Sequence, residues 1–132
     1  VSPTDPIPAY RLSMGTSLPR LGRLASFWRA HLGAALDPLA IDKLVIDCRS
    51  SDYGAALRAP KGTLAVRVEE IRGGKRQVVS HSAKYTRGLL AGALVRAATA
   101  PADADALAHA ATALPNVASV ELTETALVLI TA

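Results

Sequence analysis

The residues best suited to bind a ligand lie in one segment, Ser-His-Ser-Ala-Lys-Tyr-Thr-Arg-Gly, which runs from Ser80 to Gly88. Lys84 and Arg87 are three residues apart, so a helix beginning near Ala83 places both cations on one face. The unpaired N–H groups and the dipole at a helix N-terminus also attract anions. The segment therefore predicts a site for a phosphate or a carboxylate.

The basic residues of the chain are concentrated in one region. All 15 Lys and Arg residues and seven of the 11 acids lie at or before Arg96, which gives this region a net formal charge of +8. From Ala97 onward there are four acids and no Lys or Arg, and the whole chain carries +4. Such a basic region is typical of proteins that bind a polyanion such as nucleic acid. A well-solvated surface explains the charge equally well.

The composition is that of one globular domain. The chain has 132 residues, of which 50% are hydrophobic and 20% are charged, which excludes a disordered polypeptide. The single cysteine, Cys48, favours a reducing cytoplasm, and we expect it in the core. We expect no signal peptide, because its charged and apolar stretches do not occur near the start of the sequence, and no membrane span, because the longest apolar run is too short. The three histidines lack metal-ligand spacing, so we expect neither a metal nor a cofactor.

Helical and strand patterns alternate along the chain. Prolines at positions 3, 6 and 8 predict an extended segment over residues 1–20. Residues 21–132 then form a single α/β domain. Apolar spacing predicts helices over 21–36, 53–57, 83–98 and 102–114, the first with Phe27 and Trp28 facing the core. Strands are predicted over 43–48, 63–71, 76–82, 117–122 and 126–131. The fold is therefore mixed α/β, a small mixed sheet with packed helices.

A second group of polar residues follows the strand expected over 43–48. Asp47, Ser50, Asp52 and Tyr53 lie on a strand-to-helix turn, and such turns are common ligand sites in α/β sheets. Ser50 could instead serve only as the N-cap of the short helix. Both interpretations of Ser50 stay open at this point.

Four short motifs along the chain, in this order, resemble those of a known family. Residues 8–15, Pro-Ala-Tyr-Arg-Leu-Ser-Met-Gly, resemble the segment P-x-Y-R-L-E-M-G of the YaaA family, the peroxide stress response proteins also known as UPF0246. Residues 24–28 resemble its L-Y-x-F-W, residues 47–53 its N-L-A-S-x-E-Y, and residues 80–88 its S-F-Y-A-K-x-A-R-G. The chain departs from these motifs at Ser13, Ala25, Asp47, Arg49 and Ser82, where the family has Glu, Tyr, Asn, Ala and Tyr.

The polar residues that match the motifs imply one shared site. The resemblance assigns anion or nucleic-acid binding to Arg11, Ser50, Tyr53, Lys84 and Arg87. We expect supporting roles for Tyr10, Asp47, Asp52 and Gly88, of which Asp52 stands where the family has Glu and Asp47 where it has Asn. No catalytic residue and no metal ligand is assigned.

The resemblance covers only the C-terminal half of the family. The other half carries a helix-hairpin-helix segment associated with DNA binding, and it would come from the same protein or from a second chain. The resemblance implies a cytoplasmic protein of the oxidative stress response that binds double-stranded DNA. It also implies a protein associated with limiting free intracellular iron and oxidative DNA damage, with no cofactor.

Three functions stay open. In the first, Arg11, Lys84 and Arg87 contact the phosphates of DNA or another polyanion through a basic cleft, without catalysis. In the second, an enzyme binds a small anionic or nucleotide substrate in the same cleft, with Asp47 or Asp52 as the acid–base group. In the third, the chain is an assembly fragment that docks onto its other half.

Two structural alternatives apply to the site residues themselves. Arg11 and Arg87 could pair internally with Asp47 or Asp52 and hold loops together. Gly88 allows either the close approach of a ligand or the close packing of a neighbouring element.

Overall fold

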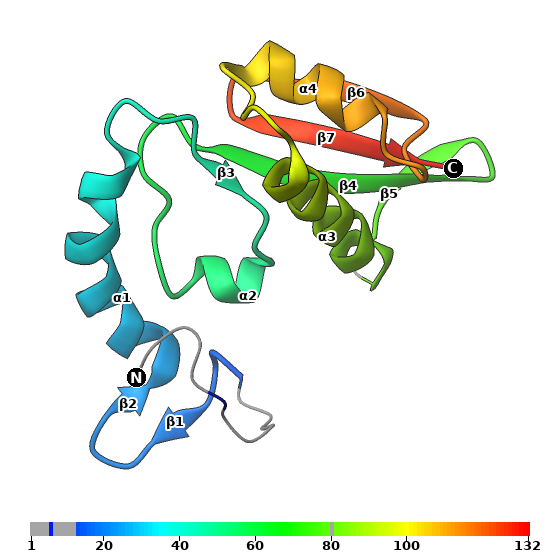
Figure 1. Ribbon diagram of the computed structural model, residues 1–132. Coiled ribbons are helices and arrows are strands. Elements are labelled where there is room, and N and C mark those ends of the chain that lie inside the picture. The colour runs from blue at the N-terminus through cyan, green and yellow to red at the C-terminus, as the bar shows by residue number, and fades with distance from the viewer. Residues whose placement is uncertain (1–5, 7–12, 80) are drawn as a thin grey trace.

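A mixed β-sheet forms the centre of the protein. The computed structural model describes residues 6, 13–79 and 81–132. The sheet has the strand order β3-β4-β7-β6, and β5 pairs with β4 (Figure 1). Its strands are β3 Ile46–Asp47, β4 Leu64–Arg72, β5 Lys75–Val78, β6 Ser119–Leu122 and β7 Ala126–Thr131. β3 and β7 run parallel to β4, whereas β5 is antiparallel to β4 and β6 is antiparallel to β7. The mixed α/β fold predicted from the sequence is confirmed.

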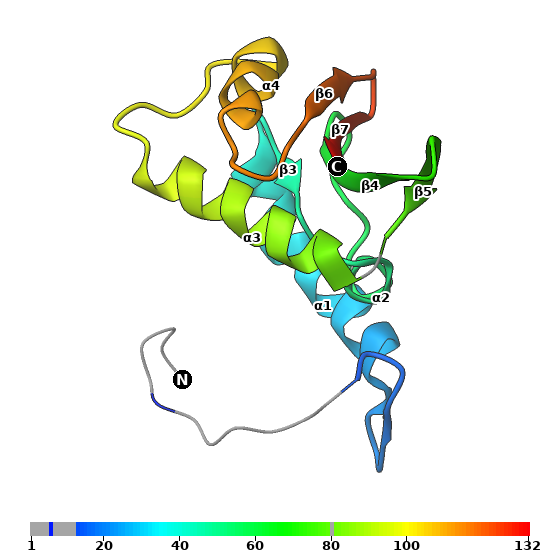
Figure 2. The same cartoon turned by 90° about the vertical axis from the view of Figure 1, so that its right-hand side faces the viewer.

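Two helices cover one face of this sheet. They are α3 His81–Arg96 and α4 Ala104–Thr112, and Figure 2 shows both on the same side of the strands. Leu90 of α3 and Leu107 of α4 are buried against Leu127 and Leu129 of β7. These four leucines are at most 1% exposed, so the main core lies between the helix pair and β4–β7.

On the opposite face of the sheet, an ion network centred on Arg76 lies over the strands. Val128 and Ile130 of β7 are buried there, although they belong to a separate small cluster. The Arg76 side chain of β5 donates to Glu69 of β4 at 2.8 Å and to both carboxylate oxygens of Glu121 of β6 at 2.8 and 3.0 Å. The register places all three residues on the Val128 face. The ion network therefore joins three strands across β7.

The first helix begins later than the sequence indicates. The structure has a short hairpin, β1 Ser17–Leu18 with β2 Gly22–Arg23, followed by α1 Leu24–Leu36 and the 3₁₀ helix η1 Asp37–Ala40. The helix predicted from residue 21 is wrong there because Gly22, with φ of 72°, closes the hairpin instead. Its end is confirmed, since Pro38 starts the tighter turn.

The expected core position is wrong for Trp28, whereas Phe27 is half-buried. Within α1 only Leu24 and Ala25 are buried. Trp28 is 38% exposed and packs edge-on against Phe27, with ring centroids 5.3 Å apart. An apolar stripe on a helix predicts that the helix has a covered face, but it does not say which element covers that face.

The other elements follow the sequence with shifted ends. The turn between β4 and β5 contains Gly73 and Gly74 at φ of 56° and 75°, which confirms the predicted hairpin. β5 stops at Val78 and α3 starts at His81, so the strand predicted through residue 82 ends four residues too late. The short helix α2 is Ser51–Gly54, earlier than predicted. Asp103 caps α4 by accepting from the Ala106 N–H at 2.8 Å.

No helix among residues 13–79 and 81–132 combines the length and the apolar character needed to cross a membrane.

Candidate functional site

A gap along one edge of β4 positions the site. On this edge β3 pairs with Leu64 and Ala65, and β5 pairs only from Glu69 onward. The stretch of β4 between these pairings therefore has no strand partner on that side. The chain leaves β3 toward α2 on one side of the gap, and β5 leads into α3 on the other. Residues from the α2 turn and from the first turns of α3 consequently face each other across a break in the sheet edge, as at the crevices where α/β proteins bind ligands.

The predicted residues Ser50, Tyr53, Lys84 and Arg87 line one cavity at this gap. The cavity has a volume of about 620 Å³. Asp52, predicted as a supporting residue, also lines it. The remaining lining residues are Ser13, Met14, Ser51, Val78, Val79 and His81. The structure thus brings together side chains from the α2 turn and from α3 that are more than 30 residues apart in the sequence. Tyr10 and Arg11 lie outside the described residues.

Arg87 is held in place by the backbone of the gap itself. Its Nε donates to the carbonyl oxygen of Val66 at 3.1 Å. Val66 pairs with β7 on one side but has no strand partner on the side of the gap. The side chain is half-buried, and its remaining guanidinium N–H groups are available to the cavity. The Arg87 Nε–H group thus gives the Val66 carbonyl the hydrogen bond that a neighbouring strand would otherwise supply. The guanidinium charge is thereby held at the cavity wall.

Lys84 is exposed, and it forms no ion pair within the part of the chain that the structure describes. Tyr53 is 53% exposed on the opposite wall. An exposed ammonium group on a flexible side chain can move to meet an anion. Lys84 and Arg87 therefore combine a mobile cation with a fixed one.

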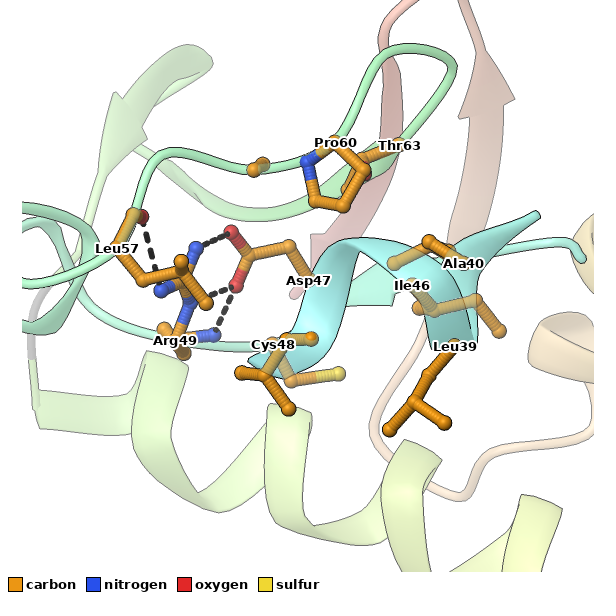
Figure 3. A pocket seen from close by; sticks show the side chains of 12 residues that line it. Leu39, Ala40, Ile46, Asp47, Cys48, Arg49, Leu57, Pro60 and Thr63 are labelled. Atoms are coloured by element: carbon orange, nitrogen blue, oxygen red, sulfur yellow. Dashed lines mark hydrogen bonds and ion pairs between the residues drawn. The ribbon is translucent and has the colours of Figure 1, made fainter. Parts of the chain in front are cut away.

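Arg87 forms no ion pair with Asp47 or Asp52 in the described part of the chain, and Asp47 is paired with Arg49 instead. The Asp47 carboxylate accepts from Arg49 at both oxygens, at 2.8 Å from Nε and 2.7 Å from Nη2. Arg49 also donates to the Leu57 carbonyl at 3.1 Å, which ties the end of β3 to the chain after α2 (Figure 3). The pair holds the two segments together beside the cavity.

Asp47 and Arg49 form one end of a neighbouring, largely apolar cavity of about 560 Å³. Figure 3 shows Leu39, Ala40 and Ile46 at its other end. Hydrogen bonds from Arg49 hold the pKa of the Asp47 carboxyl below its usual value, against an opposing effect of burial. Asp47 therefore remains ionised near neutral pH and is unsuited to act as a general acid.

Substituting Asp47 by asparagine is expected to lower the free energy of unfolding by about 1–2 kcal/mol at pH 7, because Arg49 loses a charged acceptor. A lowered folded-state pKa stabilises the fold above the ordinary Asp value of 3.8, and this stabilisation is lost as pH falls through the lower folded-state value. Urea unfolding of both proteins at pH 7 and pH 3 measures the difference, which should shrink at pH 3.

A double-mutant cycle provides the control for this prediction. In an Arg49→Gln background the Asp47→Asn substitution should have little effect at either pH, because the ion pair is already absent. An undiminished effect in that background would show that Asp47 acts through other contacts.

The structure does not support purely structural roles for Ser50 and Gly88. Ser50 occupies the N-cap position of α2, but its side chain makes no capping hydrogen bond, so its hydroxyl is not committed to the helix. A Cβ added at Gly88 would have no atom of the described neighbouring elements within 4 Å, so close packing does not require this glycine. Gly88 instead lines a cavity of about 350 Å³ that shares Ser50, Tyr53, Lys84 and Arg87 with the first one.

Cys48 is half-buried and packs against the main core, close to its expected position. Burial raises the pKa of its thiol, with a smaller opposing effect of Arg87. A thiol with a raised pKa is a poor nucleophile near neutral pH. Among the described residues no group of three or more His, Cys, Asp and Glu side chains could hold a metal ion.

Sequence reasoning did not assign a role to Arg49 or to Arg29. Arg49 was identified only as a departure from a motif, although its spacing from Asp47 allows the observed pair. Arg29 of α1 donates from Nε and Nη2 to the carbonyl of Ala55, the C-cap residue of α2, at 3.0 and 2.6 Å. Only the basic character of the region could have suggested Arg29, because its partner is a backbone group far along the chain.

Comparison with known proteins identifies relatives of this chain. A UPF0246 protein of Streptomyces coelicolor is 46% identical over 101 residues, which cover 74% of this chain and 38% of that protein. One of Corynebacterium efficiens is 44% identical over 103 residues, covering 76% and 40%. One of Ruegeria sp. is 37% identical over 99 residues, covering 67% and 39%. The chain thus spans about two fifths of the length of these curated relatives.

A family model described as "Peroxide stress protein YaaA" matches residues 1–113. The match includes every predicted site residue from Tyr10 to Gly88, together with β4 and α3 that hold the cavity walls. Residues beyond the match form β6 and β7, which complete the sheet. The match extends over most of the chain and includes all four motifs found in the sequence. The chain therefore belongs to the peroxide stress protein YaaA family, the UPF0246 proteins.

Proposed function

We propose that this chain binds double-stranded DNA through the cleft at the β4 gap, as part of a peroxide stress response that limits oxidative DNA damage. The observation that carries the proposal is that Lys84 and Arg87 line one cavity together with Ser50 and Tyr53. Two cations with neighbouring hydroxyl donors suit phosphate oxygens, which are recognised without reading base sequence. The association with limiting free intracellular iron, and action in the cytoplasm, belong to the same proposal.

The proposal concerns a longer protein than the chain itself. Because the chain spans about two fifths of its relatives, the remaining part of a family-length protein, or a second chain, supplies the rest of the DNA contact. The cleft at the β4 gap then contributes phosphate contacts to one side of the duplex.

Binding to a labelled 20-base-pair duplex, measured against salt concentration, tests this proposal. The double variant Lys84→Gln and Arg87→Gln should bind about tenfold more weakly or worse at low salt, equally for unrelated sequences. The slope of log K against log salt should become less steep by about 2, since each phosphate contact contributes about 0.9.

The matched control is the double variant Arg72→Gln and Lys75→Gln, which removes the same charge from the β4–β5 turn. It should leave both affinity and slope unchanged. Circular dichroism checks the fold, and Lys84→Gln alone provides a variant that leaves the Arg87–Val66 bond intact. If the cleft variant and the turn variant bind DNA alike, the cleft does not contact phosphate.

A second candidate function is supported by the size of the cavity. About 620 Å³ is within the range of small-ligand sites, and Asp52 lines the cavity together with Lys84 and Arg87. An enzyme acting on a small anionic or nucleotide substrate could use Asp52 as the acid–base group. Tight competition by a mononucleotide against the duplex would favour this function over DNA binding.

A further inference from the structure

Two more hollows adjoin the cleft, and each contains basic side chains. The cleft cavity shares Ser13, Met14 and Asp52 with a second hollow of about 360 Å³, whose lining includes Arg23 and Arg29. The second hollow shares Arg29 with a third of about 400 Å³. Because each hollow has lining residues in common with the next, the three hollows lie side by side, and we refer to them together as the depression. The depression passes from the start of α3 across α2 to α1, in the order in which these helices lie in Figure 1.

Basic side chains outnumber acids along this depression. Arg58 and Lys61 line the third hollow. The cations of the whole depression are Arg23, Arg29, Arg58, Lys61, Lys84 and Arg87, and the acids are Asp37 and Asp52. His81 also lines the first hollow. The resulting excess of positive charge extends well beyond Lys84 and Arg87.

Arg29 fixes the middle of the depression. It is anchored by its two hydrogen bonds to the Ala55 carbonyl, which leave Nη1 without a partner among the described residues. Arg58 and Lys61 are exposed and form no ion pair in the described part of the chain. As at the cleft, one anchored guanidinium is combined with exposed, mobile cations.

We infer that the six cations form a phosphate-binding track, along which the backbone of one nucleic-acid strand runs from Lys84 and Arg87 past Arg29 to Arg58 and Lys61. The inference deepens the proposed DNA binding and rests on it. A single phosphate would occupy one hollow and leave the others solvated. A polyanion presents one charge per 3.4 Å of each strand, so it can neutralise all three hollows at once and release their counterions. The track therefore favours a nucleic acid over a mononucleotide.

The double variant Arg58→Gln and Lys61→Gln tests the far end of the track. We expect its salt dependence of binding to the 20-base-pair duplex to become less steep by about 2, as for the cleft variant. Combining both pairs of substitutions should reduce the slope by about 4, because the contacts are to separate phosphates. The Arg72→Gln and Lys75→Gln protein is again the control of equal charge, and inorganic pyrophosphate serves as the short competitor.

The results separate the track from the proposed function. If the cleft variant loses affinity while the Arg58/Lys61 variant binds like the control, the track is wrong and the cleft stands. If both variants bind like the control, both are wrong. If only the Arg58/Lys61 variant is weakened, the continuous track is also refuted. Displacement of the duplex by micromolar pyrophosphate would contradict the track as well, because it would show that one hollow accounts for the affinity.

Discussion

Replacing Leu129 by alanine is expected to lower the free energy of unfolding by about 3–4 kcal/mol. Leu129 is fully buried in β7, the strand between β4 and β6, and it faces the core beneath α3 and α4. The substitution removes three heavy atoms and leaves a cavity that the two flanking strands cannot close without breaking their hydrogen bonds. Chemical denaturation at pH 7 measures the loss.

The matched control is Val95→Ala in α3. Val95 is 87% exposed, so its substitution should change the free energy of unfolding by less than about 0.5 kcal/mol. A loss of under 1 kcal/mol for Leu129→Ala would contradict the packing of β7 described here. The denaturant m-value should be the same in both variants if only the stability has changed.

Replacing Thr86 by valine is expected to lower the free energy of unfolding by about 1–3 kcal/mol, although the two side chains have nearly the same shape. Thr86 is fully buried in α3, where its hydroxyl donates to the Ser82 carbonyl at 3.2 Å and accepts from Asn116 Nδ2 at 2.6 Å. Without the hydroxyl, the Asn116 amide loses its acceptor, and a partly buried N–H group is left without a hydrogen bond. Thermal and urea unfolding measure the effect.

Thr86→Ser keeps the hydroxyl and removes only the methyl group, so it separates the two contributions. It should retain more stability than Thr86→Val if the hydrogen bond to Asn116 dominates. The opposite order would show that methyl packing holds α3 in place. The result also concerns the site, because Thr86 lies between Lys84 and Arg87 on the same helix.

Local patterns predict much of the fold. The alternation of residues 63–71 and the Gly73–Gly74 turn identify the β4–β5 hairpin without knowledge of anything distant. The hairpin of β6 and β7 is likewise predicted from two nearby strands. The residues that favour a tight turn and the alternation of apolar and polar side chains depend only on near neighbours, so both can be recognised from the sequence.

Local sequence patterns do not predict the order of the strands in the sheet. Nothing in the sequence indicates that β7 lies beside β4, where Ala65 pairs with Ala126. The gap on the other edge of β4 is equally hidden from local patterns, because it depends on where the pairing of β3 ends and that of β5 begins. Long-range pairing depends on the burial of whole faces, which single residues do not specify.

The cleft residues were predicted together because motif resemblance grouped them, not because spacing did. Ser50 and Lys84 are far apart in the sequence, yet they line one cavity. The roles of Arg49 and Arg29 were missed, since a long guanidinium side chain can reach many partners. Which partner it finds is decided by tertiary contacts such as the Leu57 and Ala55 carbonyls.

The pairing of β4 with β7 has a consequence for synthesis on the ribosome. β4, α2 and α3, with all the described cations of the cleft, are translated before the strand that buries the other edge of β4. A nascent chain that has reached only α3 carries the complete set of charges on an unfinished sheet with an open apolar edge. On the ribosome, the walls of the cleft can therefore pack stably only after β7 has been translated and has paired with β4.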